Sequence, residues 1–253
     1  MSDTSLTQLP EDYRALIVGA TGGLGRAFCE LLLEDRRCSE VFAASRSGQS
    51  IDAARGLRID VNDPESFGSI GKAVDADQGL HLVIIASGLL HRDDELGPER
   101  SWRDIEADTL IEVLQVNTVL PALVMRECLP ILSATSKAQS VPTIFAALSA
   151  RVGSISDNRL GGWYGYRASK AALNQLIKTS SIEMARKAPE SICVGLHPGT
   201  VDTGLSKPFQ RGVPDGKLFE PQFSASRLLT VLNGLQPSDT GQVFDWAGEL
   251  IPA

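Results

Sequence analysis

The sequence is poor in the residues that build metal centres and disulfide frameworks. Its 253 residues include three histidines and four cysteines, and no two cysteines form a C-x-x-C pair. Scattered single cysteines are typical of small buried side chains in a reducing compartment. No metal site and no disulfide are therefore predicted.

Positive charge and long apolar runs are scarce as well. The 24 lysines and arginines are outnumbered by 31 aspartates and glutamates, so the net charge is −7. This balance argues against a nucleic-acid surface and against binding to anionic membranes. No apolar run approaches the length of a membrane span, and residues 1–14 lack the basic start and apolar core of a secretion signal. We expect a cytoplasmic protein without a nucleic-acid or membrane partner.

Short apolar runs alternate with longer amphipathic segments. Strands are predicted at 15–20, 41–45, 57–61, 80–87, 142–148, 191–196 and 242–246, and helices at 25–35, 101–116, 118–134 and 164–187. Strand runs without polar alternation indicate a parallel sheet covered on both faces. The pattern predicts one α/β domain over residues 1–253, with a doubly wound, mainly parallel sheet and helices on both faces. Residues 1–12 are expected to be flexible, and the Pro- and Gly-rich segment 203–223 to form a loop over a substrate site.

A glycine-rich turn, "VGATGGLGRAF", follows the first predicted strand and opens a helix. Gly19, Gly23 and Gly25 have the spacing G-x-x-x-G-x-G, which allows a phosphate to approach backbone N–H groups at a helix N-terminus. The alternative is a tight turn that is glycine-rich by chance. Its position favours a Rossmann-type dinucleotide site, with these predicted contacts: Gly19, Thr21, Gly22, Gly23, Leu24 and Gly25.

The end of the second strand bears on the choice of nucleotide. A carboxylate there would bind the ribose 2′-hydroxyl of NAD(H), but this chain has Ser45 and Arg46, and no acid before Asp52. A hydroxyl and a guanidinium suit a 2′-phosphate, so NADP(H) is favoured over NAD(H). The alternative for Arg46 is a solvated surface position. Asp60 and Val61, after the third strand, are expected to frame the adenine, unless Asp60 simply ends the strand.

The segment "GGWYGYRASKAALNQL" carries two tyrosines and one lysine. Tyr166 and Lys170 are four residues apart and share one helix face, whereas Tyr164 has no lysine at that offset. A nearby ammonium stabilises a phenolate, so we expect a lowered pKa for Tyr166 and a role in proton transfer. The alternative is an amphipathic pair on a solvated helix face.

Together, the glycine turn and Y-x-x-x-K resemble the short-chain dehydrogenase/reductase family over almost the whole chain. Within the family, "GLLH", "GSISDNRLGGWYGYRASKAALN" and "HPGTVDTGLSKPF" are most similar to carbonyl-reductase-like and C-factor-like proteins. The resemblance implies that Tyr166 is the general acid and that Lys170 lowers its pKa and binds the nicotinamide ribose. It implies that Asn117 belongs to a proton relay through water, the alternative being a satisfied core asparagine at a helix irregularity.

Further cofactor contacts follow from the same resemblance. They are Ala86, Ser87 and Gly88 after the fourth strand, and Pro198, Gly199, Val201 and Thr203 beside the nicotinamide carboxamide. The chain departs from the family pattern at Val18, where a threonine is usual, and at 85–88, where Ile-Ala-Ser-Gly replaces Asn-Asn-Ala-Gly. We interpret these changes as altered packing without loss of catalysis.

The serine that polarises the carbonyl is harder to place. Ser149 is the only hydroxyl at the end of the fifth strand, and we assign it that role. An alignment anchored on Gly153 would instead put Ala150 in the catalytic position, and Ser154 and Ser156 lie further into the following loop.

The resulting hypothesis is an NADPH-dependent reductase of an aldehyde or ketone, or the reverse oxidation of an alcohol. The segment 203–223 and the surroundings of His91, Trp163 and Tyr164 would shape the pocket. The alternative is a nucleotide-sensing or signalling protein with little turnover. A nucleotide-sugar epimerase would need a longer chain. The family resemblance also implies a homodimer or homotetramer that pairs through the two long helices.

Overall fold

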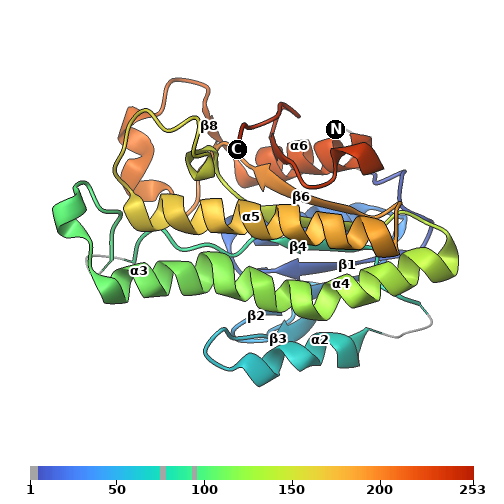
Figure 1. The fold of residues 1–253 in the computed structure, drawn as a ribbon. Coiled ribbons are helices and arrows are strands. Elements are labelled where there is room, and N and C mark those ends of the chain that lie inside the picture. Colours follow the sequence, from blue (N-terminus) through green and yellow to red (C-terminus); the bar gives the residue numbers. More distant parts are fainter. Residues whose placement is uncertain (1–4, 75–77, 93–95) are drawn as a thin grey trace.

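The computed structural model describes residues 5–74, 78–92 and 96–253. Their centre is a parallel sheet in the order β3-β2-β1-β4-β5-β6-β9 (Figure 1). Its strands are β1 (Tyr13–Val18), β2 (Cys38–Ser45), β3 (Arg55–Arg58), β4 (Leu82–Ile85), β5 (Ile144–Leu148), β6 (Ile192–His197) and β9 (Val243–Asp245). A separate short pair joins β7 (Thr200–Val201) to β8 (Leu218–Phe219). The predicted doubly wound α/β fold is confirmed.

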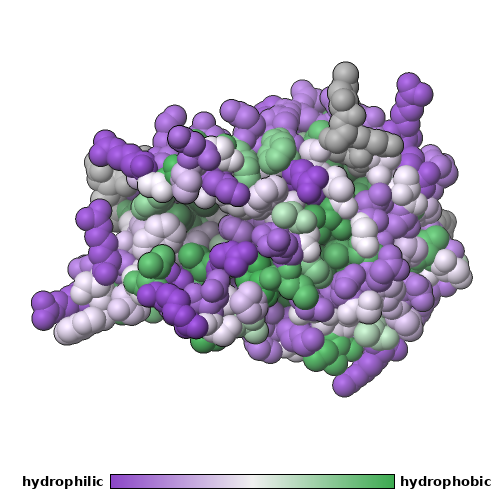
Figure 2. Space-filling view, turned by 90° about the horizontal axis from the view of Figure 1, so that it is seen from above, coloured by the Kyte–Doolittle hydropathy of each residue, from purple (hydrophilic) through white to green (hydrophobic). Residues whose placement is uncertain are grey.

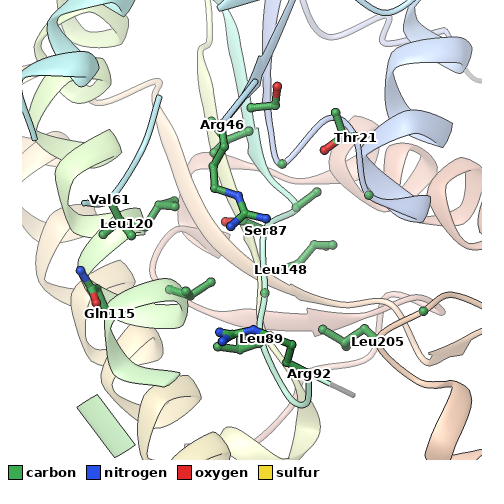
Figure 3. A pocket seen from close by; sticks show the side chains of 18 of the residues that line it. Thr21, Arg46, Val61, Ser87, Leu89, Arg92, Gln115, Leu120, Leu148 and Leu205 are labelled. Atoms are coloured by element: carbon green, nitrogen blue, oxygen red, sulfur yellow. The ribbon is translucent and has the colours of Figure 1, made fainter. Parts of the chain in front are cut away.

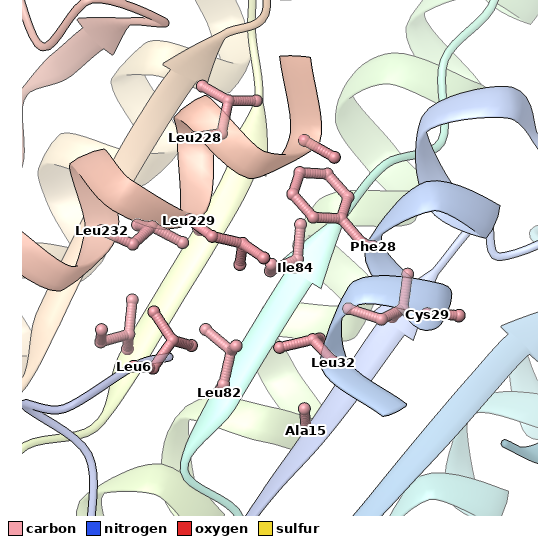
Figure 4. Packing of buried hydrophobic residues seen from close by; sticks show 14 of the residues in the cluster. Leu6, Ala15, Phe28, Cys29, Leu32, Leu82, Ile84, Leu228, Leu229 and Leu232 are labelled. Atoms are coloured by element: carbon pink, nitrogen blue, oxygen red, sulfur yellow. The ribbon is translucent and has the colours of Figure 1, made fainter. Parts of the chain in front are cut away.

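Helices cover both faces of the sheet. They are α1 (Gly23–Glu34), α2 (Gly68–Ala73), α3 (Ala107–Leu114), α4 (Leu120–Gln139), α5 (Tyr164–Lys187) and α6 (Pro221–Gly234). In Figure 1, α4 and α5 lie side by side across the front of the sheet. On the opposite face, α1 and α6 bury Phe28, Leu32 and Leu228 against Ile84 of β4 (Figure 4). Full burial of each such side chain contributes about 1.5–3 kcal/mol.

Consecutive residues of each strand serve opposite cores. In β1, Ile17 belongs to the core under α1 and α6, and Leu16 to the core under α4 and α5. This is why the strands read as unbroken apolar runs in the sequence. From above, the surface is largely hydrophilic, with apolar residues gathered in patches between the polar ones (Figure 2).

Three expectations need correction. Leu6 and Leu9, placed in a flexible segment by the sequence, are buried in the core, and residues 1–4 lie outside the described residues. The segment 203–223 is not all loop, because β8 lies within it and α6 begins at Pro221. Only 107–114 of the expected helix 101–116 is α-helical.

The two expected helices around Asn117 are in fact continuous. α3 and α4 are joined by a π-helical turn, Gln115–Val119. The whole stretch Ala107–Gln139 is long and apolar enough to cross a membrane by length and composition alone, which the sequence runs had not suggested. Its inner residues Val124, Cys128 and Leu132 are fully buried in the core under α4 and α5, whereas 28% of the apolar 18-residue window as a whole is buried.

Candidate active site

A cavity of about 830 Å³ lies at the carboxyl ends of β1, β2, β4 and β5 (Figure 3). Ligands of open α/β folds bind at this edge of the sheet. The predicted site residues that line the cavity are Gly19, Thr21, Gly22, Gly23, Leu24, Ser45, Arg46, Asp60, Val61, Ala86, Ser87, Gly88, Ser149, Tyr166, Lys170, Pro198 and Thr203. Four others, Gly25, Asn117, Gly199 and Val201, are not among its lining residues.

The glycine turn is shaped by close backbone approaches. Gly19 has a φ of +82°, and a Cβ at this position would lie 2.6 Å from the backbone N of Ser87. Gly25 serves packing, since its Cβ would lie 2.2 Å from the carbonyl oxygen of Gly19. Helix α1 begins at Gly23 and has no side-chain cap. Its N-terminus therefore faces the cavity with N–H groups that suit a phosphate.

Ser45 and Arg46 lie at the end of β2, at one extreme of the cavity. Ser45 is buried, and its hydroxyl accepts a hydrogen bond from Gly48 N and contacts Ser47 Oγ, both at 3.2 Å. The Arg46 side chain extends into the cavity (Figure 3) and forms no ion pair with any described residue. Its guanidinium is therefore the group at this end that can meet an anion, and the Ser45 hydroxyl is already used locally.

Tyr166 and Lys170 are both buried on the same face of α5. Lys170 Nζ donates to the Leu148 carbonyl oxygen at 2.8 Å and lies 5.8 Å from the centre of the Tyr166 ring. Tyr164 is 38% exposed and does not line the cavity. The structure thus brings only Tyr166 to the site, as the helix spacing predicts.

The direction of the tyrosine shift differs from our expectation. Burial raises the pKa of Tyr166 to about 12 and lowers the pKa of Lys170 to about 8. Desolvation disfavours each charged form, and the ammonium hydrogen-bonds a backbone carbonyl, not the phenol. Burial is therefore the cause of the raised pKa of Tyr166.

Asn117 is fully buried in the π-helical turn. Its Nδ2 donates to Leu89 O at 2.8 Å and to Ser169 Oγ at 3.1 Å, and its Oδ1 accepts from Leu89 N at 2.8 Å. The side chain thus ties the loop after β4 to helix α5. This arrangement matches the core-asparagine interpretation, and a role for the residue in a proton relay stays a prediction.

The three candidate serines are in different places. Ser149 lines the cavity, but its hydroxyl donates to Asn174 Oδ1 at 2.6 Å. Ser154 and Ser156 instead donate to the carbonyl oxygen of Ala253, and neither lines the cavity. Ala150 belongs to the same apolar cluster as Tyr166, and the choice between Ser149 and Ala150 for the catalytic position stays a prediction.

The cofactor residues outside the cavity have packing roles. A Cβ on Gly199, which has a φ of +75°, would lie 2.7 Å from the Phe219 ring, and Val201 pairs with Phe219 in the β7–β8 ribbon. Thr203 does reach the cavity and packs on Gly23, since a Cβ there would lie 2.6 Å from the threonine methyl.

Sequence reasoning missed the lining residues Gln115 and Asn62. Gln115 Nε2 donates to Asn62 Oδ1 at 3.0 Å and thereby joins the π-helical turn to the loop after β3. Asn62 directly follows the predicted Asp60 and Val61, and this adjacency was the available signal. Leu89, Arg92 and Leu205 line the cavity as well, in agreement with the expected pocket around His91 and in the segment 203–223.

Comparisons with known proteins agree with this geometry. The family model for short chain dehydrogenase matches residues 13–213. C-signal of Myxococcus xanthus is 33% identical over 150 residues, which cover 59% of this chain and 81% of that protein. The 1-hydroxy-2-glutathionyl-2-methyl-3-butene dehydrogenase of Rhodococcus sp. (strain AD45) is 27% identical over 90% of this chain and 93% of its own length.

Solved structures are similar over nearly the full length. The NADPH-bound carbonyl reductase from chicken fatty liver superposes with a TM-score of 0.81 at 25% identity, covering 99% of this chain and 98% of that one. The carbonyl reductase Sniffer of D. melanogaster has a TM-score of 0.79 at 23% identity, covering 96% and 99%, and supports the fold alone.

Proposed function

Because the chain belongs to the short-chain dehydrogenase family of oxidoreductases, we propose that it reduces an aldehyde or ketone with NADPH. One observation carries the proposal. Tyr166 and Lys170 are buried in the wall of the same cavity whose other end holds the glycine turn and Arg46. A proton donor and a phosphate cradle in one cavity suit hydride transfer coupled to proton transfer.

The residues present fit a dinucleotide. Gly19 and Gly23 allow the turn to pack closely on Ser87 and Thr203, and the uncapped N-terminus of α1 would hold the pyrophosphate. The buried Ser87 hydroxyl has no hydrogen-bond partner among the described residues and could bind a ligand group in the cavity. Arg46 would bind a 2′-phosphate. When bound, the nicotinamide supplies the hydride.

The protein groups handle the proton. The pKa of about 12 keeps Tyr166 protonated near neutral pH, so its hydroxyl can donate to the substrate oxygen as negative charge develops there. Lys170 lies close enough to stabilise the phenolate that remains. To bind the substrate oxygen, the Ser149 hydroxyl must turn away from Asn174, which exchanges one hydrogen bond for another.

The test is NADPH oxidation at 340 nm against a panel of aldehydes and ketones. Turnover that needs both NADPH and a carbonyl compound supports the proposal. The similarity to C-signal favours one other candidate, a nucleotide-binding protein that signals without useful turnover. Tight NADPH binding without oxidation of NADPH by any carbonyl compound would favour that candidate.

We also propose that the chain forms a homodimer or homotetramer through α4 and α5. Between these helices runs a groove lined by Met125, Leu129, Pro130 and Met184, among others. Val119, directly before α4, and Ile182 in α5 are 45% and 48% exposed and add apolar surface beside the groove. Light scattering at micromolar concentration tests the proposal, and a monomer alone would contradict it. A cytoplasmic location is proposed from the net charge and cysteine usage.

A further inference from the structure

Three aromatic side chains from separate parts of the chain meet beside Tyr166. Trp163 precedes α5, Phe209 lies in the short turn Lys207–Gly212, and His91 follows β4. The Trp163 ring centre is 6.2 Å from that of Tyr166 and 5.1 Å from that of Phe209. His91 also contacts Phe209, with ring centres 5.7 Å apart. The phenyl ring of Phe209 thus contacts both an indole and an imidazole, and the indole also contacts the proposed acid.

The backbone at Trp163 has an unusual conformation. Trp163 has a φ of +54°, and Gly161 and Gly162 before it also have positive φ. Such a conformation is disfavoured for a bulky L-residue and persists only where the surroundings impose it. Here the backbone N–H of Trp163 donates to the backbone carbonyl oxygen of Glu99 at 2.6 Å, and Arg167 Nε donates to the carbonyl oxygen of Gly162 at 3.0 Å.

Glu99 also secures the start of α5. It is 5% exposed, and its carboxylate accepts hydrogen bonds from Gly165 N at 3.1 and 3.2 Å. One buried residue thus holds both Trp163 and the first turn of the helix that carries Tyr166. The backbone that carries both rings is therefore held by a buried residue.

Phe209 belongs to a segment whose hydrogen bonds are mainly local. Its N–H donates to Ser206 O at 2.8 Å, and Gln210 Nε2 donates to Asp202 Oδ1 at 2.9 Å, so these hydrogen bonds are local. His91 Nε2 donates to Gly204 O at 2.8 Å and connects the segment to the loop after β4. Such a segment can move without opening either core.

Phe209 and Trp163 lie next to the cavity without lining it. His91 and Tyr166, which contact these two rings, do line the cavity. We propose that carbonyl substrates with a phenyl-sized, uncharged ring displace Phe209, pack against Trp163 and present their carbonyl oxygen to Tyr166. The inference rests on the proposed carbonyl reduction and names its substrate class. Buried Leu90 and Ala150, also packed at Tyr166, provide no charge for an ionic substrate.

A matched substrate pair isolates the aromatic contact. Phenylacetaldehyde and cyclohexylacetaldehyde have rings of similar size, and a methylene group separates each ring from the carbonyl. Because a favourable aromatic pair adds binding beyond its buried area, we expect a preference of about 3- to 10-fold in kcat/KM for the phenyl compound, mainly through KM. Equal kcat/KM values for the two aldehydes would overturn the proposal.

Variants separately test the substrate slot, which is the space beside Trp163 that Phe209 fills, and the displacement of Phe209 by the substrate. Trp163→Leu should abolish the preference, Trp163→Phe should retain part of it, and the control Trp102→Leu, at a 66% exposed position, should leave it unchanged. Phe209→Ala should lower the KM for phenylacetaldehyde, because the substrate no longer competes with an internal ring. A raised KM in Phe209→Ala would show that Phe209 binds the substrate in place, and would overturn displacement.

A binding measurement keeps this proposal distinct from the proposed function. Titration calorimetry with 2-phenylethanol and 2-cyclohexylethanol, in the presence of NADPH, involves no turnover, because neither the alcohol nor the reduced cofactor can accept a hydride. Tighter binding of the phenyl alcohol by the wild type but not by Trp163→Leu supports the slot, even if no carbonyl compound is reduced. Equal binding of both alcohols overturns it, even if reduction is observed.

Discussion

Lys170 Nζ lies 5.8 Å from the centre of the Tyr166 ring and donates to Leu148 O at 2.8 Å, with both side chains buried. Burial lowers the pKa of Lys170 to about 8 and raises that of Tyr166 to about 12. As pH rises through about 8, the lysine loses the charge that stabilises the phenolate, while the tyrosine keeps its proton. We therefore predict that kcat/KM for carbonyl reduction falls above pH 8.

The variant Lys170→Arg tests whether Lys170 is the group responsible for this pH dependence. A guanidinium keeps its charge throughout the range, so the fall near pH 8 should disappear from whatever activity remains. A pH–rate profile between pH 6 and 10 measures the effect. An unchanged fall near pH 8 in Lys170→Arg would assign the titration to another group.

The serine assignment predicts three unequal alanine variants. Ser149 is the candidate serine that lines the cavity, and loss of a donor to developing negative charge typically costs about 100- to 1,000-fold in kcat. Ser149→Ala should lose about 100-fold, because its hydroxyl already has a partner in Asn174. Ser154→Ala and Ser156→Ala should stay active, since both hydroxyls bind Ala253 O. If all three variants stayed active, Tyr166 would polarise the carbonyl without a serine.

Cofactor choice should depend on Arg46. Arg46→Asp places a carboxylate where a 2′-phosphate would lie, so we expect NADPH binding to weaken by about 10- to 100-fold, with a relative gain for NADH. Fluorescence titration with both nucleotides measures the ratio. Arg103→Asp carries the same change of net charge outside the cavity lining and should leave the ratio unchanged. Tighter binding of NADH than NADPH by the wild type would contradict the assignment.

His197 should make the fold sensitive to acid. Burial, helped by the charge of Arg151, lowers its pKa to about 4, and its Nδ1 has no hydrogen-bond partner among the described residues. The unfolded chain takes up this proton near the ordinary pKa of 6.5, so the stabilisation is complete above about pH 6.5 and is lost as pH falls towards 4.

The variant His197→Asn removes this titration. Over that pH range, the wild type should lose up to about 3 kcal/mol more unfolding free energy than the variant. Urea unfolding at pH 7 and pH 4.5 measures the difference. Parallel losses in the two proteins would show that another group dominates.

Local patterns predicted most of the fold. Unbroken apolar runs such as those at β1 and β4 specify strands buried on both faces, and the structure confirms the parallel sheet. Helix α6 was missed because its first residue is Pro221, at the end of a segment rich in turn residues. The continuous helix through Asn117 was also missed, because a π-helical turn has no marker in the periodicity.

Spacing alone was enough to predict that Tyr166 and Lys170 lie close together, because residues four apart on a helix share one face. The Ser149–Asn174 hydrogen bond could not be predicted, since it joins a strand end to a helix 25 residues later. The pKa of Tyr166 was predicted in the wrong direction, because depth of burial depends on tertiary packing and not on the distance in sequence to a lysine.

The central claim is that Tyr166 supplies the proton for carbonyl reduction with NADPH. The most direct test compares wild type, Tyr166→Phe and Tyr164→Phe in NADPH oxidation with one accepted carbonyl substrate, alongside NADPH affinity. We predict that Tyr166→Phe loses about 100- to 10,000-fold in kcat with NADPH affinity nearly intact, and that Tyr164→Phe changes little. Near-normal turnover by Tyr166→Phe, or the reverse ranking of the two variants, would contradict the account.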